Sequence, residues 1–560
     1  MKTVIETAIN NICTELGFGE EVFFTVEHPS DLAHGDYACN VAMVLSKRVG
    51  KSPIEIAEQF LSGLDGQIEY VEKIVIAGPG FLNFYLARDF FAKEIDRINS
   101  IGKDWGKNDS WVGKRVLFEY TSPNLFKPLH IGNLVGNIIG ESLSRLFEYG
   151  GAEVKRFNYP SDIGLTVAKG VWGLRKTGGN PSDILALGEA YRVGNEAYEA
   201  EAEEAEEIKS INKALYENTD PELTSLREQG IATSKASLGD ILKKLGTSFD
   251  HEICESMVSE PGAKLVKAHN GDVFKESDGA IVYEGDKVGL HTRVFISSKG
   301  IPTYEAKDIG HFKLKNELEP DWDLSVIVTG SEQTEYFKVV YAVIRELFTE
   351  FKNRELEHVP TGFLTLTTGK MSSRKGNVLT GESLLEEMEV AAKEKSNNAR
   401  TGNLEELAEE VAVAALKYQI LKHGIGSNII FDKEKALSFE GDSGPYLQYT
   451  NARINSALEK AKQNEITGSI KDLPAEIYRI EKLVYQFAEV VEEALAERAP
   501  HKVATFLTQL ASEFNSFYAQ EKIADKEDQS APYKVALAKA VSLTLINGLW
   551  VLGIKAPERM

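Results

Sequence analysis

The sequence has little cysteine and no long uninterrupted apolar run. Its three cysteines, Cys13, Cys39 and Cys254, are scattered and odd in number. That spacing disfavours a disulfide framework and a cysteine-rich zinc site, and it favours a reducing compartment such as the cytoplasm. No apolar run approaches the roughly 18 residues of a membrane-spanning helix. The N-terminal "MKTVIETAINNICTELGFG" mixes polar and apolar residues, which predicts an amphipathic helix and not a secretory leader.

Positive charge is also in short supply. The formal net charge is −22, which disfavours a protein that coats nucleic acid indiscriminately. A local basic patch that docks one folded RNA is still compatible with this composition. At 560 residues the chain is too long for a single hydrophobic core, so we expect several domains.

Three regions differ in their patterns. Residues 1–105 combine helical periodicity with two strand-like runs joined by a Gly-Pro-Gly turn, which predicts an α+β N-terminal domain. Residues 106–404 include a strand, a helix and a second strand in succession, which predicts a Rossmann-type parallel sheet. Residues 405–560 carry long helical periodicities, which predict an all-helical domain.

The stretch "EYTSPNLFKPLHIGN" precedes the first helical pattern of the middle region. Its prolines favour an extended loop, and His130, Gly132 and Asn133 then stand where the helix begins. Helix N-termini beside the carboxyl ends of parallel strands bind nucleotide phosphates, and the glycine permits close approach. The side chains of His130 and Asn133 can donate to phosphate oxygens. The alternative interpretation is that His130 only caps the helix.

A second stretch, "TTGKMSSRKGNV", concentrates positive charge in a flexible segment. Lys370, Arg374 and Lys375 lie within six residues, flanked by glycine and serine. This arrangement suits a mobile loop that closes on a polyphosphate. The alternative is an exposed basic loop without such a role.

Together the two stretches resemble the paired signatures of class I aminoacyl-tRNA synthetases. The likeness is greatest to the arginyl-tRNA synthetase family and covers essentially the whole chain. "HPSDLAHGDYACNVAMVLSKRVGKSP" resembles that family's N-terminal additional domain, which contacts the outer corner of the tRNA. "FEGDSGPYLQYTNARI" and the terminal "LGIKAPERM" resemble its helical anticodon-binding domain.

The resemblance implies a reaction and its participants. L-arginine is activated with ATP to arginyl-adenylate and transferred to the 3′ end of tRNA(Arg), and in this family the first step typically requires bound tRNA. Magnesium is expected with the ATP and not on protein ligands, so no metal-binding residue is predicted. We further expect a cytoplasmic monomer that is not associated with a membrane.

The resemblance also implies roles for residues of both stretches. The expected ATP contacts are Lys127, His130, Gly132, Asn133, Lys370, Ser372 and Ser373. The expected catalytic residues are His130, Asn133, Lys370, Arg374 and Lys375. The chain departs from the family pattern twice, with Asn133 where histidine is commonest and Ser373 where the second lysine usually stands. Whether Arg374 or Lys375 replaces that lysine is left open.

An arginine pocket needs carboxylates arranged to pair with a planar cation. By resemblance, Glu119, Ser122 and Asn124 hold the α-amino and carboxylate end of the substrate. Tyr304 and Asp308 read the side chain, with Asp308 as the guanidinium partner, and Gln333 is a further pocket position. The residues themselves agree in part, because Tyr304 and Asp308 are four apart and share a helical face. A surface carboxylate is the alternative for each acid.

A short run in the last region suggests contacts with anticodon bases, which are read by stacking and edge hydrogen bonds. The candidate residues are Tyr446, Gln448, Tyr449, Asn451 and Arg453. Core packing is the alternative for the tyrosines. Two rival functions are also open: a class I lysyl-type tRNA synthetase and a non-catalytic tRNA-binding paralogue.

Overall fold

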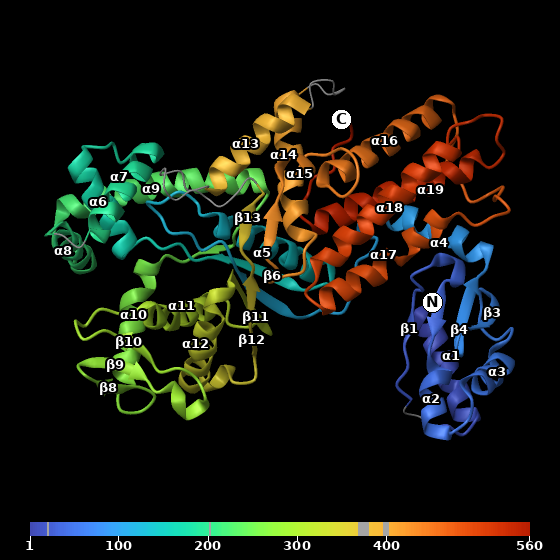
Figure 1. The fold of residues 1–560 in the computed structure, drawn as a ribbon, viewed down its shortest axis with the longest axis horizontal. Coiled ribbons are helices and arrows are strands. Elements are labelled where there is room, and N and C mark those ends of the chain that lie inside the picture. Colours follow the sequence, from blue (N-terminus) through green and yellow to red (C-terminus); the bar gives the residue numbers. More distant parts are fainter. Residues whose placement is uncertain (20–21, 201–202, 368–379, 396–402) are drawn as a thin grey trace. The chain divides into compact units, whose positions relative to one another are not determined.

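The computed structural model describes residues 1–19, 22–200, 203–367, 380–395 and 403–560 (Figure 1). The chain divides into two compact units, each assembled from separate stretches. The first contains residues 1–105, 453–488 and 509–547, and the second contains residues 106–452, 489–508 and 548–560. The long C-terminal helices therefore contribute to both units, and each unit is described by itself.

The first unit begins with an α+β arrangement. Its helices are α1 (Lys2–Glu15), α2 (Val41–Val49), α3 (Pro53–Leu64) and α4 (Arg88–Ile101). Its strands are β1 (Val26–Glu27), β2 (Tyr37–Cys39), β3 (Val71–Ala77) and β4 (Phe81–Leu86), in the antiparallel order β1-β2-β4-β3. The predicted turn joins β3 to β4, and Gly78 and Gly80 both adopt positive φ there.

Residues of the long C-terminal helices complete this unit. These helices are α16 (Gly444–Gln463), α17 (Arg479–Ala496), α18 (Pro500–Gln520) and α19 (Ala531–Val551). Arg88 forms an ion pair with the buried Glu481 at 2.5 Å, and Lys482 pairs with Asp36 at 2.8 Å. Among the described residues, α19 is the one helix long and apolar enough to cross a membrane by length and composition, and most of it is buried inside the protein.

The second unit is built on a parallel sheet. Its strands are β5 (Arg115–Glu119), β6 (Glu153–Asn158), β7 (His251–Glu252), β11 (Leu324–Gly330) and β12 (Glu355–Thr361). Their order is β12-β11-β5-β6-β7, and every neighbouring pair is parallel. Helix α5 (Ile131–Tyr149) joins β5 to β6, which confirms the predicted strand-helix-strand unit. Because β5 has β6 on one side and β11 on the other, the strand order reverses beside β5, where doubly wound sheets bind ligands.

Two insertions separate these strands and form distinct groups in Figure 1. The first consists of α6 (Leu165–Thr177), α7 (Ile184–Glu199), α8 (Glu203–Glu217) and α9 (Pro221–Leu245). The second carries α10 (Glu255–Ala268) and the antiparallel strands β8 (Lys275–Ser277), β9 (Ala280–Tyr283) and β10 (Arg293–Ile296). Helices α11 (Tyr304–Leu318) and α12 (Thr334–Leu347) lead to β11 and β12.

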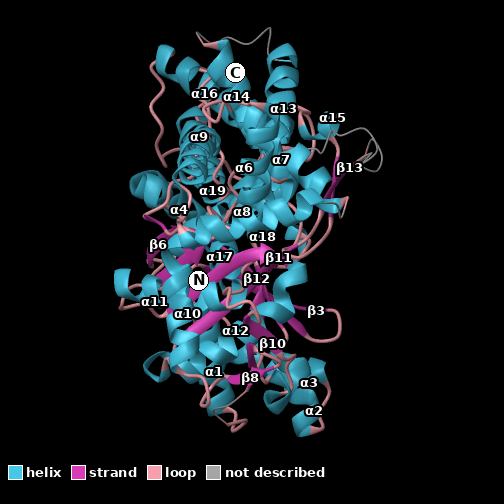
Figure 2. Ribbon diagram, turned by 90° about the vertical axis from the view of Figure 1, so that its left-hand side faces the viewer, coloured by secondary structure: helices cyan, strands magenta, loops and turns pink. Residues whose placement is uncertain are grey.

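The remaining elements follow the parallel sheet. Strands β13 (Leu364–Leu366) and β14 (Ile429–Phe431) pair in parallel, and the helices are α13 (Gly381–Lys395), α14 (Leu404–Leu421) and α15 (Lys433–Ala436). Outside the sheets the described chain is mostly helical (Figure 2). The predicted fold class is therefore confirmed: an α/β parallel-sheet region, an α+β N-terminal region and a helical C-terminal region.

Candidate active site

The first signature stretch lies between the carboxyl end of β5 and the start of α5. His130 is the N-cap residue of α5, and its Nδ1 accepts a hydrogen bond from the Gly132 N–H at 3.1 Å. His130 therefore does cap the helix, and its exposed ring lies at the helix N-terminus. Desolvation and the nearby Lys127 lower the pKa of His130, against a smaller opposing effect of Glu332. The imidazole is therefore neutral at pH 7 and acts through hydrogen bonds.

The loop before α5 has a strained backbone. Thr121, Ser122 and Phe126 adopt positive φ values of 76°, 41° and 65°. Such residues cost on the order of 1–3 kcal/mol each and occur where the surroundings hold them. Here the Asn133 Nδ2 donates to the Thr121 carbonyl at 2.7 Å, and the Asn137 Nδ2 donates to the Thr121 Oγ1 at 2.9 Å. The Asn133 amide is therefore already used to shape the loop.

Two polar groups of this loop are available to a ligand. The Oγ of Ser122 is buried and has no hydrogen-bond partner among the described residues. Lys127 is half-buried, and burial lowers its pKa. Its ammonium lies 5.7 Å from the centre of the Tyr191 ring, and none of the ion pairs in the described part of the chain includes it. A cation without a carboxylate partner beside a helix N-terminus suits an anionic ligand.

The second signature stretch lies outside the described residues. It contains the predicted residues Lys370, Ser372, Ser373, Arg374 and Lys375. The residues that follow it are described and contact the first stretch. Thr380 forms an isolated antiparallel bridge with His130, and the Gly381 N–H donates to the Leu129 carbonyl at 2.8 Å. The chain that leaves the second stretch therefore runs against the N-terminus of α5.

Glu119 ends β5 and is almost completely buried. Its Oε2 accepts from the Lys315 Nζ at 2.9 Å and lies 3.6 Å from the His311 Nδ1. Burial alone would raise the pKa of Glu119, but Lys315 and His311 hold it below its ordinary value. Burial lowers the pKa of His311 to about 4, so this ring is neutral at pH 7. Glu119 is thus an ionised carboxylate whose charge is balanced by Lys315.

Asp308 on α11 differs from Glu119 in that its pKa is raised. Burial, together with Glu119 and Glu255, raises its pKa to about 8, although the Tyr336 hydroxyl donates to its Oδ2 at 2.5 Å and opposes this. Asp308 forms no ion pair in the described part of the chain. Glu255, at the start of α10, pairs instead with Lys307 at 2.7 Å, and both side chains are buried.

The structure brings the two predicted acids to one place. A small cavity is lined by Glu119, Asp308, His311 and Lys315, together with apolar residues of β11 and α12. Tyr159 stacks on His311 with ring centres 4.0 Å apart, and its buried hydroxyl has no hydrogen-bond partner among the described residues. An unpaired acid with buried and unsatisfied polar groups nearby is suited to a polar, positively charged ligand.

The other predicted pocket residues surround this region less closely. Tyr304 is the first residue of α11 and is 62% exposed, while its ring faces the Lys307 ammonium at 5.0 Å. Gln333 lies in a short 3-10 turn directly after β11, and Asn124 is exposed in the strained loop, where it bridges to Ser161. The predicted set therefore gathers at the carboxyl ends of β5 and β11.

Sequence reasoning missed the residues that set the state of each acid. Lys315 and His311 lie seven and three residues after Asp308, on the same helical face, so their spacing was a usable signal. Tyr336 likewise follows Gln333 by three residues. No local pattern pointed to Glu255, because an insertion of the fold brings it to Lys307.

The predicted anticodon contacts divide by burial. Gln448 is buried, and its Nε2 donates to the Lys555 carbonyl at 2.8 Å, while Asn451 is buried as well. Because they are buried, these two side chains are not accessible to RNA. Tyr449 is 38% exposed, and Tyr446 is partly exposed. Arg453, in the first unit, donates to Asn515 and lies over the Tyr518 ring.

Comparison with known proteins decides the family. The family profile described as tRNA synthetases class I (R), catalytic domain, matches residues 95–433. The chain belongs to this family. Two further profiles match, the arginyl tRNA synthetase N terminal domain over residues 1–86 and the DALR anticodon binding domain over residues 447–560. Family membership thus extends over nearly the whole chain.

Relatives in the family are similar along their full length. A protein of Pediococcus pentosaceus named arginine–tRNA ligase is 30% identical over 564 residues, covering 99% of this chain and 98% of the relative. One of Streptococcus uberis with the same name is 32% identical, with 100% of both chains covered. The solved structure of Thermus thermophilus arginyl-tRNA synthetase has a TM-score of 0.82 at 25% identity, again with 100% of both chains covered.

Proposed function

We propose that this chain is an arginine–tRNA ligase. It activates L-arginine with ATP to arginyl-adenylate and transfers the arginyl group to the 3′ end of tRNA(Arg), releasing AMP and pyrophosphate. Membership of the class I (R) family along the chain supports this function over the lysyl-type and non-catalytic alternatives. The observation that carries the assignment is the cavity that contains the unpaired Asp308 beside the buried Glu119.

In this proposal the nucleotide binds over the N-terminus of α5. His130 offers its ring to the phosphates, and Gly132 lets the nucleotide approach the backbone. Lys127 supplies a cation that has no carboxylate partner in the described part of the chain. Asn133 acts by holding the Thr121 carbonyl, which its observed hydrogen bond supports. Magnesium enters with the ATP as part of the substrate.

The second signature stretch stabilises the departing pyrophosphate. We assign this role to Lys370, with Ser372 and Ser373 as further phosphate contacts, and to Arg374 or Lys375 in place of the missing lysine. The bridge between Thr380 and His130 supports the convergence of the two stretches.

Arginine binds with its guanidinium toward Asp308. Tyr304 and Gln333 line the same side, and Ser122 and Asn124 contact the α-amino and carboxylate end. Glu119 contributes negative charge to that end, although Lys315 already balances much of it. A bound guanidinium would stabilise the carboxylate form of Asp308, because an opposite charge within about 4–6 Å lowers an acid's pKa.

No side chain needs to act as a covalent nucleophile. The substrate carboxylate attacks the α-phosphate, pyrophosphate leaves, and the protein aligns the reactants and stabilises developing charge. Alignment alone can supply roughly 7–11 kcal/mol of barrier reduction.

The remaining assignments complete the proposal. Residues 1–105 contact the outer corner of the tRNA, residues 106–404 catalyse activation and transfer, and residues 405–560 bind the anticodon, with Tyr446 and Tyr449 as the candidates for stacking. The protein acts as a cytoplasmic monomer away from membranes.

Charging assays test the proposed function. Purified protein is incubated with total tRNA, ATP, magnesium and labelled arginine or labelled lysine in parallel. We expect labelled tRNA only with arginine. Lysine charging without arginine charging would establish the lysyl-type alternative, and tRNA binding without either product would establish the non-catalytic one.

A further inference from the structure

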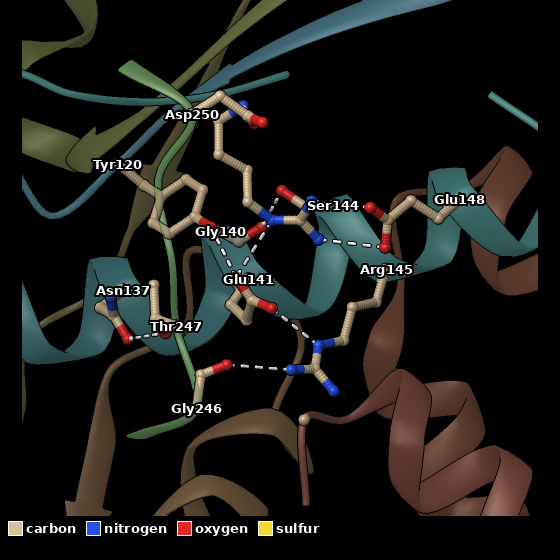
Figure 3. Close-up of polar contacts among 12 residues, drawn as sticks. Tyr120, Asn137, Gly140, Glu141, Ser144, Arg145, Glu148, Gly246, Thr247 and Asp250 are labelled. Carbon is tan, nitrogen blue, oxygen red and sulfur yellow. Dashed lines mark hydrogen bonds and ion pairs between the residues drawn. The ribbon is translucent and has the colours of Figure 1, made fainter. Parts of the chain in front are cut away.

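Two basic side chains in the second unit each connect the same pair of helix ends. Arg145 on α5 donates from Nη2 to the Gly246 carbonyl at 3.1 Å and from Nη1 to the Trp550 carbonyl at 3.0 Å. Lys417 on α14 donates to the carbonyls of Leu245 and Gly553, both at 2.6 Å. The C-terminal ends of α9 and α19 are thus joined twice (Figure 3 shows Arg145 and Gly246).

These contacts offset the repulsion between two helix C-terminal ends. The last carbonyls of a helix lack intrahelical partners and carry partial negative charge, so two helix ends that meet repel each other. Lys417 is buried, and no ion pair in the described part of the chain includes it. The Ser142 hydroxyl, also on α5, donates to the Val551 carbonyl at 3.0 Å. Three side chains from α5 and α14 are therefore committed to these main-chain carbonyls.

Hydrogen bonds connect the end of α9 to the strained loop of the candidate active site. Directly after Gly246, the Thr247 hydroxyl donates to the Asn137 Oδ1 at 3.1 Å, and the Asn137 Nδ2 donates to the Thr121 Oγ1 at 2.9 Å. Figure 3 shows Arg145, Gly246, Thr247 and Asn137 in this succession. Thr121 is the first of the residues with positive φ in the loop.

A neighbouring side chain on the same face of α5 holds Arg145 in its orientation. Asn133, Asn137, Glu141 and Arg145 are spaced four residues apart, so they align along one side of the helix. Glu141 accepts from the Arg145 Nε at 2.7 Å and from the Tyr120 hydroxyl at 2.6 Å (Figure 3). Arg145 is held in orientation by Glu141 while its two remaining nitrogens reach the helix ends.

We propose that Arg145 is a positioning residue for amino-acid activation. By fixing the C-terminal end of α9 it keeps Thr247 on Asn137, and Asn137 then keeps Thr121 in the strained backbone that presents the arginine and ATP contacts. Among the described residues, the contacts of Arg145 are with Glu141, Gly246 and Trp550, none of which is assigned to either substrate. The inference rests on the proposed function, since the loop matters only if the site activates arginine.

The role requires arginine and not merely positive charge. Arg145 uses Nε, Nη1 and Nη2 on three different acceptors. A lysine carries a single compact ammonium and cannot span three acceptors arranged around a planar fork. Arg145→Lys therefore keeps the charge and removes the bridge.

The chain offers a matched control in Arg354. Arg354 is also partly buried, donates to a main-chain carbonyl, that of Pro320 at 2.6 Å, and stacks on Trp322 at 5.1 Å. Arg145 stacks on Trp550 at the same 5.1 Å. Arg354 follows the 3-10 turn after α12, at the opposite end of the parallel sheet from the strained loop.

The first experiment compares Arg145→Met, Arg145→Lys and Arg354→Met by tRNA- and arginine-dependent ATP–pyrophosphate exchange, with urea unfolding alongside. We expect kcat to fall at least about tenfold in both Arg145 variants, because a misplacement of about 1 Å costs that much or more in alignment. The KM for tRNA stays within about twofold, and Arg354→Met keeps wild-type kcat despite a similar loss of stability. Wild-type kcat in Arg145→Lys, or equal kcat in Arg145→Met and Arg354→Met, would overturn the proposal.

A double-mutant cycle tests the route, using Thr247→Val as the milder second change. Thr247→Val removes the hydrogen bond to Asn137, so it should lower kcat in the same direction. If Arg145 acts through Thr247, Arg145→Met adds no further loss of kcat to Thr247→Val. Additive losses would refute this route. Wild-type exchange activity tests the proposed function, and the ratio of variant to wild type tests Arg145, so the two failures are distinguishable.

Discussion

The two acids of the candidate arginine pocket share a cavity but not a charge state. Glu119 is buried against Lys315, which keeps its pKa below the ordinary value. Asp308 meets a phenol and further acids, and its pKa rises to about 8. Glu119 therefore has a cation without substrate, whereas Asp308 has none among the described residues. Two carboxylates in one cavity can thus differ in charge state, because a buried ammonium lies beside only one of them.

The largest effect is expected from breaking the satisfied pair. Lys315→Met leaves a buried carboxylate without its cation, so the free energy of unfolding should fall by about 3–5 kcal/mol. Urea denaturation followed by tryptophan fluorescence measures this. Lys313→Met, an exposed lysine on the same helix, is the control and should change stability by less than about 0.5 kcal/mol. Equal stability of the two variants would contradict a stabilising pair between Glu119 and Lys315.

Replacing Asp308 should instead weaken arginine binding without lowering the free energy of unfolding. Asp308→Asn removes the partner of a guanidinium, which costs about 3 kcal/mol or more and raises the arginine dissociation constant by a factor of roughly 100. The variant should unfold at a urea concentration no lower than the wild type, since a desolvated acid is removed. Calorimetric titration with arginine gives the constant. An unchanged value would mean that another acid reads the guanidinium.

The raised pKa of Asp308 predicts a pH dependence. An acid whose pKa rises on folding contributes stability below its unfolded pKa and loses that contribution as pH rises through about 8. Arginine needs the ionised form, so its affinity should rise with pH up to about 8 and then level off, by about tenfold per pH unit below that point. Titrations between pH 6 and pH 9 measure this on wild type and on Asp308→Asn. A slope that persists in Asp308→Asn would assign the titration to another group.

The smallest effect is expected from removing the phenol that donates to Asp308. Tyr336→Phe removes the hydroxyl that donates to Asp308, which costs about 1.5–3 kcal/mol for a bond to an ionised acceptor. Arginine affinity should fall by roughly 10- to 100-fold, and the pH at which it levels off should move upward. The same titrations provide both readings. Tyr341→Phe is a control, because its hydroxyl donates to the Glu357 carbonyl.

Much of this architecture was predictable because it follows from local patterns. Apolar periodicity after Pro128 predicted α5, and His130 was expected where that helix begins. The Gly-Pro-Gly turn predicted the β3–β4 hairpin, and alternating strands and helices predicted the parallel sheet. The two pocket acids were placed by resemblance, and their common cavity is consistent with that placement.

What could not be predicted depends on partners distant along the chain. Gln448 reads as a polar residue suited to RNA, yet it donates to the Lys555 carbonyl in the folded protein. The Asn133 amide reads as a phosphate donor, and in the folded protein it donates to the Thr121 carbonyl. A donor's use is set by whichever acceptor the fold brings within about 3 Å, and no local pattern encodes that distance.

The amino-acid order alone thus establishes the family, the sequence of helices and strands, and the chemical types available for catalysis, because these depend on periodicity and on short motifs. Only the folded chain decides which acid has a cationic partner and which amide already donates to a carbonyl. It also decides which basic side chains join the ends of α9 and α19. Charge states and hydrogen-bond partners depend on burial and on distances of a few ångströms, and only long-range packing sets these.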